Sequence, residues 1–389
     1  MSTLTAAVET RIVALNSQLE AARHAYYTLA APIMEDVAYD LLEKELKSLV
    51  KANPSLAHLA PVIKTVGSDL TNGGRVAHSI PMLSIENFYD EASFLAWYDE
   101  KAMDGHATVV LEPKRDGISV SLTFRDGKLL RSLTRGDGTS GEDITAATRA
   151  CPAIPTSISL KGNIEVRGEL VMKNSTLARI NDEATKTGQK TYASTRNLTA
   201  GTMKQKNLDN VPDRDIQIRP WDALGDNLPA SRLERLRLLA KEGFAEPRSV
   251  LVSDRDKILP TLRDLLEKNK TSDIAADGVV MKIDDVPSCQ ALGVSSNYTN
   301  YQICFKPQND KGITYLRGVN WFVGRSGKIT PVGIVDPITL AGAVITNVNL
   351  NNITWIREMG LKINSRISLI RSGGVIPVVD KVLDENEDL

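Results

Sequence analysis

Apolar residues near the start of the chain repeat with a helical period. Between Val8 and Leu29 they recur every three or four positions, which is the spacing of one buried stripe on an amphipathic helix. A second apolar row runs from Leu42 to Leu49 and stops before Asn53-Pro54, where proline closes a helix. We expect residues 1–65 to form a helical unit that precedes all of the β structure.

The middle of the chain, from about Pro81 to Lys311, mixes both periods without a regular strand–helix–strand rhythm. Alternating, β-branched stretches predict strands at 107–113, 118–124, 128–134, 163–172, 277–283 and 301–306. Amphipathic stretches predict helices at 90–102, 175–187, 231–242 and 256–268. Short turns such as Arg125-Asp126-Gly127 favour antiparallel pairing of these strands.

From Ile313 onward, glycines separate short strand patterns. Strands expected at 313–323, 328–335, 344–349, 366–371 and 375–382, with one helical stretch at 351–358, suit a small closed barrel of the oligonucleotide-binding (OB) kind. The sequence therefore predicts an α+β protein with a helical subdomain at 1–65, a mixed domain at 66–312 and an OB-fold domain at 313–389 that ends in an acidic tail.

Length and charge refine this picture. A chain of 389 residues is too long for one ordinary core, which agrees with several domains. The net charge of −1 gives no overall sign of a nucleic-acid partner, but residues 313–381 hold eight Lys/Arg against three Asp/Glu, an excess of +5. A polyanion partner fits this excess, and so does an ordinary solvated surface.

Cysteine and histidine positions exclude two kinds of site. The three cysteines, Cys151, Cys289 and Cys304, form no C-x-x-C pair, and the four histidines have no metal-ligand spacing. This pattern argues against a disulfide framework and against a zinc site. No N-terminal signal pattern and no membrane-length apolar run is present, so we expect a cytoplasmic protein without a membrane partner.

The first candidate for chemistry is Lys114, in the segment Glu112-Pro113-Lys114-Arg115-Asp116-Gly117. A period of two places Glu112 and Lys114 on one face of the expected strand, opposite the apolar Val109 and Leu111. A lysine fixed at a strand end beside carboxylates can serve as a nucleophile or a phosphate binder. The ordinary alternative is a solvated surface lysine, and K-x-D-G alone does not decide between them.

Further charged residues occupy strand positions beside glycine. They are Glu165, Arg167 and Glu169 on one expected strand, Lys282 and Lys306 on two others, and Arg135 where a strand enters a glycine turn. Each segment alone is compatible with a half-exposed strand and solvated charges. Together they supply lysines, arginines and carboxylates suited to activating a phosphate ester.

These motifs resemble, in their order along the chain, those of NAD-dependent bacterial DNA ligases, over roughly residues 20–382. The resemblance rests on Lys114–Gly117, Arg135–Asp143, Glu165–Glu169, Asp277–Lys282, Phe305-Lys306, Pro81–Asn87, Ser194–Asn197, Val323–Pro331 and Arg371–Pro377. K-x-D-G and D-G-V-V belong to all covalent nucleotidyltransferases. The Arg135–Asp143 stretch and Asp36-Val37-Ala38-Tyr39-Asp40 are more specific to the NAD-dependent branch.

The resemblance implies that 66–312 is a covalent nucleotidyltransferase (adenylation) domain and that the protein seals nicks in double-stranded DNA in three steps. Lys114 attacks the α-phosphorus of NAD⁺, nicotinamide mononucleotide (NMN) leaves, and AMP then passes to the 5′-phosphate before the 3′-hydroxyl seals the nick. Lys114 must lose a proton to attack, and we expect the nearby cations Lys282 and Lys306 to lower its pKa.

The resemblance also assigns roles to the other site residues. Glu112 would read the adenine, Arg135 and Glu169 would hold the ribose region, and Asp116 and Glu169 would bind Mg²⁺ through water. Lys282 and Lys306 would hold phosphate oxygens. Ser84 and Ile85 would line the nucleotide pocket, and Tyr26, Asp36, Tyr39 and Asp40 would contact NMN. DNA contacts are implied for Arg196, Arg325, Arg371, Val375 and Ile376.

The chain departs from the family pattern at several positions. Tyr27 stands where histidine is usual, Lys204 where arginine is usual, and Gly374 where an acidic residue is common; an arginine expected just before Asp277 is replaced by Asn269 or Lys270. The 389 residues contain none of the family's usual zinc finger, helix-hairpin-helix motifs and BRCT domain. We expect a monomer, and either a naturally short ligase, for example a viral one, or a truncated protein; the acidic terminus favours the former.

Two other functions remain open at the level of sequence. An ATP-dependent ligase or a capping-type guanylyltransferase would retain Lys114, Glu169, Lys282 and Lys306 but would not need residues 1–65. A non-catalytic DNA-binding protein built on the OB fold would not need Lys114. Labelling with NAD⁺ or ATP in separate reactions distinguishes the first alternative, and the Lys114→Ala variant distinguishes the second.

Overall fold

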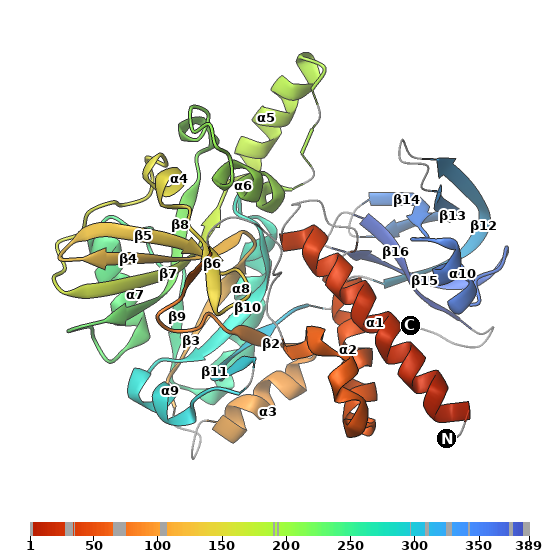
Figure 1. Ribbon diagram of the computed structural model, residues 1–389, viewed down its shortest axis with the longest axis horizontal. Helices are drawn as coiled ribbons and strands as arrows, with labels where there is room; N and C mark the ends of the chain where they lie inside the picture. The colour runs from red at the N-terminus through yellow and green to blue at the C-terminus, as the bar shows by residue number, and fades with distance from the viewer. Residues whose placement is uncertain are drawn as a thin grey trace. The chain divides into compact units, whose positions relative to one another are not determined.

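A computed structural model describes residues 3–27, 34, 36–64, 75–101, 107–189, 191–192, 194–295, 297–307, 311–323, 329–340, 343–372 and 376–383. The chain divides into two compact units (Figure 1). The first consists of Met1–Ile33 with Glu45–Pro307, and the second of Met34–Lys44 with Gln308–Leu389.

Two helices begin the chain, α1 (Thr3–Tyr27) and α2 (Asp36–Ala52), followed by the short 3₁₀ helices η1 (Pro54–Leu59) and η2 (Pro61–Lys64). Ile12, Leu15 and Leu19 on α1 are fully buried, which confirms the predicted apolar stripe. The Asn16 side chain accepts a hydrogen bond from the Val62 backbone N–H at 2.9 Å, so the 3₁₀ segment is fastened to α1.

The first sheet of the mixed region has the order β2-β11-β10-β3-β9. Its strands are β2 (Ser84–Phe88), β11 (Tyr298–Phe305), β10 (Ala276–Ile283), β3 (Val109–Arg115) and β9 (Val250–Val252). Strands β2 and β11 pair in parallel, and the other pairs of this sheet are antiparallel. The sheet is therefore mainly antiparallel, as the short turns predicted. Helices α3 (Glu91–Lys101) and α8 (Ile258–Lys270) bury Phe94 and Leu262 in the same apolar cluster as Leu111 of β3.

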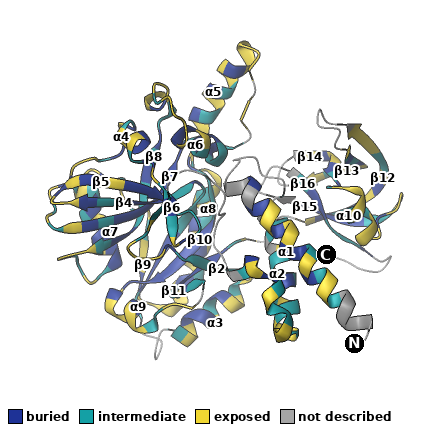
Figure 2. Cartoon of the chain, viewed as in Figure 1, coloured by how far each residue is buried: buried dark blue, intermediate teal, exposed yellow. Residues whose placement is uncertain are grey.

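The second sheet has the order β5-β4-β7-β8, and all its pairs are antiparallel. Its strands are β4 (Ile118–Arg125), β5 (Lys128–Thr134), β7 (Asn163–Val171) and β8 (Gln217–Gly225). Helices α4 (Thr145–Arg149), α5 (Asn174–Lys186), α6 (Thr195–Met203) and α7 (Arg232–Lys241) belong to the same region, as does α9 (Val286–Leu292) after β10. The central strands of both sheets, β3, β10, β4 and β7, are largely buried, and the helices expose one side (Figure 2).

The second unit contains a closed barrel with the strand order β12-β13-β14-β16-β15. The strands are β12 (Lys311–Val323), β13 (Ile329–Leu340), β14 (Ala343–Asn349), β15 (Arg366–Ser372) and β16 (Ile376–Val382), with α10 (Ile353–Glu358) between β14 and β15. Leu316, Val348 and Ile367 lie in its core. This closed five-stranded barrel confirms the predicted OB fold.

The predicted α+β fold is confirmed, and several elements were not predicted. Strands β1 (Arg75–Ala77), β2, β6 (Ser140–Glu142), β8 and β9 and helices α4, α6 and α9 had no sequence prediction. The capping box at the start of α7 is present, because the Ser231 side chain accepts from the Glu234 N–H at 3.2 Å. Within the described residues, no helix is long and apolar enough to span a membrane.

Candidate active site

Strands β3 and β10 lie side by side and carry four charged residues at the centre of the candidate site. Lys114 pairs with Gly278 and Glu112 with Val280 in the antiparallel register, which places Lys282 two residues beyond on the same face. Gly278 has no room for a side chain, because an added Cβ would lie 2.3 Å from the Phe305 carbonyl oxygen. Asp277 precedes this glycine.

Lys114 forms an ion pair with Asp277. Its Nζ lies 3.0 Å from Oδ1 and 2.9 Å from Oδ2, and the two side chains are 27% and 31% exposed. Lys306 Nζ approaches the same carboxylate at 3.8 Å. Desolvation alone would lower the pKa of Lys114, but the Asp277 charge outweighs it and raises the pKa above the ordinary lysine value.

The expectation that neighbouring cations lower the pKa of Lys114 is therefore wrong for this structure. Lys282 is not available to repel the ammonium, because it is paired with a carboxylate of its own. Lys306 shares the Asp277 carboxylate with Lys114 rather than acting as an isolated positive charge. The resting protein thus holds Lys114 protonated, and a role as nucleophile would require that the proton leave.

Lys282 forms the second lysine–carboxylate pair, with Glu112. These side chains are only 2% and 9% exposed. Lys282 Nζ also donates to the Trp221 carbonyl at 2.9 Å and lies 5.1 Å from the Trp221 ring centroid. Ser249 Oγ donates to the other carboxylate oxygen of Glu112 at 3.1 Å, so both oxygens have a donor.

Arg135 is bound to the segment that leads into β2. Its Nη2 donates to Ser84 Oγ at 2.8 Å and its Nε to the Met82 carbonyl at 3.1 Å. The structure therefore joins Arg135 and Ser84, which are far apart in sequence, and places Ile85 next to them on β2. This arrangement agrees with a pocket wall formed by β2 and the turn after β5.

Glu169 and Asp116 lie near Lys114 and influence each other electrostatically. Burial raises the pKa of Glu169 to about 7, against the opposing charge of Arg196 and a 2.7 Å hydrogen bond from Ser119 Oγ. Arg196 Nη1 on α6 binds Asp116 Oδ1 at 3.0 Å. The turn can approach β7 because residue 117 is glycine, where a Cβ would meet the Leu170 carbonyl oxygen at 2.1 Å.

The donor set at Asp116 and Glu169 fits Mg²⁺. This ion prefers carboxylate oxygens and retains several waters, so one or two carboxylates with substrate phosphates suffice. The raised pKa of Glu169 shows that its negative charge lacks full compensation in the protein alone, and a divalent cation would supply this. Among the described residues, no group of three acidic, histidine or cysteine side chains could hold a metal without a substrate.

The remaining predicted site residues are not joined to this cluster by described contacts. Tyr39 lies half-buried on α2. The side chains of Tyr26, Asp36 and Asp40 lie outside the described residues, as do Arg325 and Val375 entirely. Arg371 is on β15 and Ile376 on β16, in adjacent register positions, with side chains outside the description.

Asp277, Trp221, Ser249 and Ser119 belong to the cluster and were missing from the predicted site. Asp277 was visible in the Asp277-Gly278 motif, but only the structure shows that it binds Lys114. Trp221 lies on β8, a strand that the sequence does not predict because Pro220 interrupts its alternation. Ser249 adjoins the very short β9 and gave no sequence signal.

Comparison with protein families accounts for these features. Residues 71–309 match the family described as the NAD-dependent DNA ligase adenylation domain, and residues 313–389 match the NAD-dependent DNA ligase OB-fold domain. Residues 5–60 match the DNA ligase-like, N-terminal NAD⁺-binding domain.

Individual relatives agree with this. The DNA ligases of Campylobacter curvus (strain 525.92) and Campylobacter lari (strain RM2100 / D67 / ATCC BAA-1060) are 33% and 34% identical over 95% and 94% of this chain. The chain spans only 57% and 56% of their lengths. A solved structure named Pmar-Lig_PreS3, 12% identical, has a TM-score of 0.40 over 87% of this chain and 70% of its own, and adds nothing to the sequence matches. Because one family model alone matches residues 71–309, more than half of the chain, the protein belongs to the family of NAD-dependent DNA ligases.

Proposed function

We propose that the protein seals nicks in duplex DNA by joining 3′-hydroxyl and 5′-phosphate ends, with NAD⁺ as the donor of AMP. The observation that carries this proposal is the pairing of Lys114 with Asp277 beside the buried Lys282–Glu112 pair. The first pair offers a nucleophile, and the second offers a donor and an acceptor fixed for reading a base. The relatives with this family pattern are named DNA ligases.

Adenine is the base that this donor–acceptor pattern selects. A carboxylate of Glu112 accepts from the 6-amino group, and the ammonium of Lys282 donates to the ring nitrogen N1. Guanine presents an oxo group and an N–H at these positions, so both contacts would fail. Trp221, half-buried beside Lys282, supplies an aromatic surface on which the base stacks.

The ribose and phosphates lie toward the more exposed part of the site. Arg135 and Glu169 hold the ribose region, with Ser84 and Ile85 lining the pocket. Lys306 balances negative charge on the phosphate oxygens as Lys114 attacks, whereas Lys282, which the family resemblance also assigned to the phosphates, is held at the base by its pair with Glu112. Asp277 holds the Lys114 side chain in the ion pair. The pair opens when another cation binds the Asp277 carboxylate or a phosphate binds the Lys114 ammonium.

The reaction then has three displacements at phosphorus. The neutral Lys114 amine bonds to the α-phosphorus of NAD⁺, and the bond to the NMN phosphate breaks. The 5′-phosphate of the nick next displaces Lys114 from AMP. Finally the 3′-hydroxyl bonds to the phosphorus of the 5′-phosphate, the bond from that phosphorus to AMP breaks, AMP leaves and the strand is continuous. Mg²⁺, held by Asp116 and Glu169 through water, would supply positive charge for the phosphate oxygens.

The other parts of the chain bind the remainder of the substrates. Residues 1–65 form the NMN-binding subdomain and precede an adenylation domain at 66–312. The residues of the subdomain that contact NMN are Tyr26, Asp36, Tyr39 and Asp40. The OB-fold domain at 313–389 contacts the DNA backbone and minor groove through Arg325, Arg371, Val375 and Ile376, and Arg196 adds a contact from α6. The protein works as a monomer in the cytoplasm.

A sealing assay tests this proposal. A duplex with one nick is incubated with Mg²⁺ and either NAD⁺ or ATP, and the joined strand is measured on a denaturing gel. We expect sealing with NAD⁺ alone, loss of sealing in Lys114→Ala, and full sealing in Lys128→Ala, which removes an exposed lysine on β5. Sealing that requires ATP, or that survives in Lys114→Ala, would contradict the proposal.

A further inference from the structure

Strand β8 carries an extra residue where it meets the buried Lys282–Glu112 pair. Asp222 and Pro220 pair with consecutive residues of β7, so Trp221 between them has no partner on that strand. A bulge of this kind redirects the extra residue and strengthens the local twist. Here it turns the Trp221 carbonyl toward Lys282 Nζ and brings the ring to the same nitrogen.

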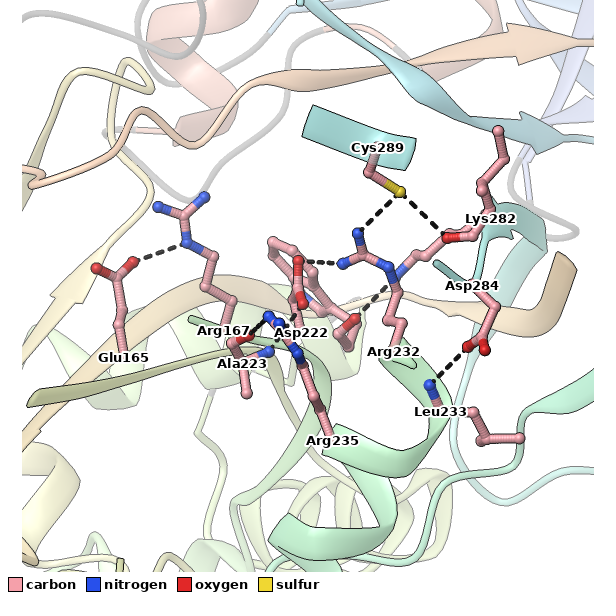
Figure 3. Close-up of polar contacts among 12 residues, drawn as sticks. Glu165, Arg167, Asp222, Ala223, Arg232, Leu233, Arg235, Lys282, Asp284 and Cys289 are labelled. Carbon is pink, nitrogen blue, oxygen red and sulfur yellow. Dashed lines mark hydrogen bonds and ion pairs between the residues drawn. The ribbon is translucent and has the colours of Figure 1, made fainter. Parts of the chain in front are cut away.

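The residue after the bulge is held by an arginine from α7 (Figure 3). Arg232 Nη1 forms an ion pair with Asp222 Oδ2, and Nη2 donates to Cys289 Sγ at 3.5 Å. The same guanidinium lies 5.2 Å from the ring centroid of Tyr301 on β11. Arg232 therefore connects the second sheet, through β8, with β11 of the first sheet.

Two further hydrogen bonds between α7 and its neighbours reinforce this connection. Arg235 Nη1 donates to the Ala223 carbonyl of β8 at 2.8 Å. The Leu233 N–H donates to Asp284 Oδ1, one residue after β10, at 2.9 Å. The start of α7 is thus fixed between the bulge that positions Trp221 and the end of the strand that carries Lys282.

The ion pair in this connection is unusually well buried, with Asp222 6% and Arg232 3% exposed. Burial alone would lower the pKa of Arg232, but the adjacent Asp222 carboxylate outweighs this effect and raises the pKa above the ordinary arginine value. The arginine therefore stays charged. Buried ion pairs seldom stabilise a fold more than well-packed apolar side chains do, because both ions lose hydration. A role in fixing geometry explains the pair better than a role in stability.

We propose that Arg232 and Asp222 are positioning residues that hold Trp221 against Lys282 and so set the affinity and base specificity of the nucleotide pocket. Neither side chain has a described contact with Lys114, Asp277 or Glu112, so they act through the β8 bulge. This inference rests on the proposed function, since it concerns the adenine of NAD⁺. It goes beyond that function by assigning base discrimination to a pair outside the pocket.

The test uses the full chain with the double substitution Asp222→Asn and Arg232→Met, which removes both charges and leaves neither partner as an unpaired buried ion. Formation of lysyl-AMP is measured with NAD⁺ and with nicotinamide hypoxanthine dinucleotide, which has an oxo group in place of the 6-amino group. We expect the KM for NAD⁺ to rise about 10-fold, the effect of one lost hydrogen bond. We expect kcat to change less than about 2-fold and the preference for NAD⁺ to fall about 10-fold.

The matched control replaces an ion pair of the same unit away from the site, with Asp99→Asn and Arg255→Met. It should leave both KM and the preference unchanged. A folded double variant at Asp222 and Arg232 with the wild-type KM and preference would overturn the inference. Failure of the wild-type protein to form lysyl-AMP from NAD⁺ would instead overturn the proposed function, so the two failures are distinguishable.

A conservative variant covers the case in which the double variant does not fold. Arg232→Lys keeps the positive charge beside Asp222 but loses the fork that also reaches Cys289. We expect its KM for NAD⁺ to rise about 3-fold with kcat unchanged, intermediate between the wild type and the double variant. A wild-type KM in this folded variant would contradict a positioning role.

Discussion

The candidate site contains two lysine–carboxylate pairs that share the same two strands and differ in burial. Lys114 of β3 pairs with Asp277 of β10, while Glu112 of β3 pairs with Lys282 of β10. The first pair is about one-quarter to one-third exposed, and the second is nearly inaccessible. A half-exposed pair can exchange partners with water and substrate at little cost, whereas breaking a buried pair is costly, so the buried pair keeps its geometry. The first is suited to reaction and the second to recognition.

Removing Lys114, the proposed nucleophile, should give the largest effect. Lys114→Ala is expected to lower the rate of lysyl-AMP formation by about 10⁴-fold or more, because no other group replaces the nucleophile. The fold should remain stable, since the partner Asp277 keeps access to water and to Lys306. Rapid-quench measurement of AMP incorporation gives the rate, and thermal melting gives the stability. A variant that is inactive because it is unfolded would remove the distinction between the pairs.

Breaking the buried pair should instead damage the fold. Lys282→Met leaves the Glu112 carboxylate buried without its cation, and we expect a loss of about 3–5 kcal/mol in the free energy of unfolding. Urea denaturation measures it. The double variant Glu112→Gln with Lys282→Met should recover most of this loss, because no buried charge remains. Equal stability of Lys282→Met and the wild type would show that the pair is more hydrated than its burial indicates.

Glu169 provides a test that depends on pH. Its pKa of about 7 lies above the ordinary value of 4.5, so the native state binds the proton more tightly than the unfolded state. Stability contributed by this group is therefore lost as pH rises from about 4.5 through 7. Glu169→Gln should raise the free energy of unfolding by about 2–3 kcal/mol at about pH 8, and much less at about pH 5. A difference independent of pH would contradict the raised pKa.

Asp277 pairs with Lys114 and raises its pKa, so under the proposed function its substitution should give a smaller, directional effect. Because Asp277 raises the pKa of Lys114, the rate of lysyl-AMP formation should increase with pH from about 6 to about 9 in the wild type. Asp277→Asn removes the charge that stabilises the ammonium, so the profile should move to lower pH. Labelling of Lys114 with an amine-reactive reagent, followed by mass spectrometry, measures the same shift without substrate. A profile that moves to higher pH would show that Asp277 does not govern this proton.

The sequence predicted the positions of the charged residues better than their partners. Alternation placed Glu112 and Lys114 on one face and Lys282 opposite an apolar row, and the strands bear this out. Which lysine of β3 and β10 pairs with which carboxylate depends on the register of the two strands, and short-range sequence patterns do not contain this register. For the same reason the pKa of Lys114 was predicted to be lowered, although the structure pairs it with Asp277 and raises it.

Strands β8 and β9 were harder to predict than β3 and β10. Strand β8 contains Pro220 and a bulge at Trp221, so it lacks a clean alternation, and β9 has only three residues. The buried Asp222–Arg232 pair joins that strand to a helix whose capping box was predicted correctly. Local signals therefore identified α7, but its contact with the bulge arises from tertiary packing.

Mapping the site of adenylation tests the central distinction between the two pairs most directly. The purified protein is incubated with NAD⁺ and Mg²⁺, digested, and analysed by tandem mass spectrometry for AMP attached to lysine. We expect one AMP, on Lys114, with Lys282 and Lys306 unmodified. AMP on either of those lysines, or AMP on Lys114 from ATP but never from NAD⁺, would contradict it.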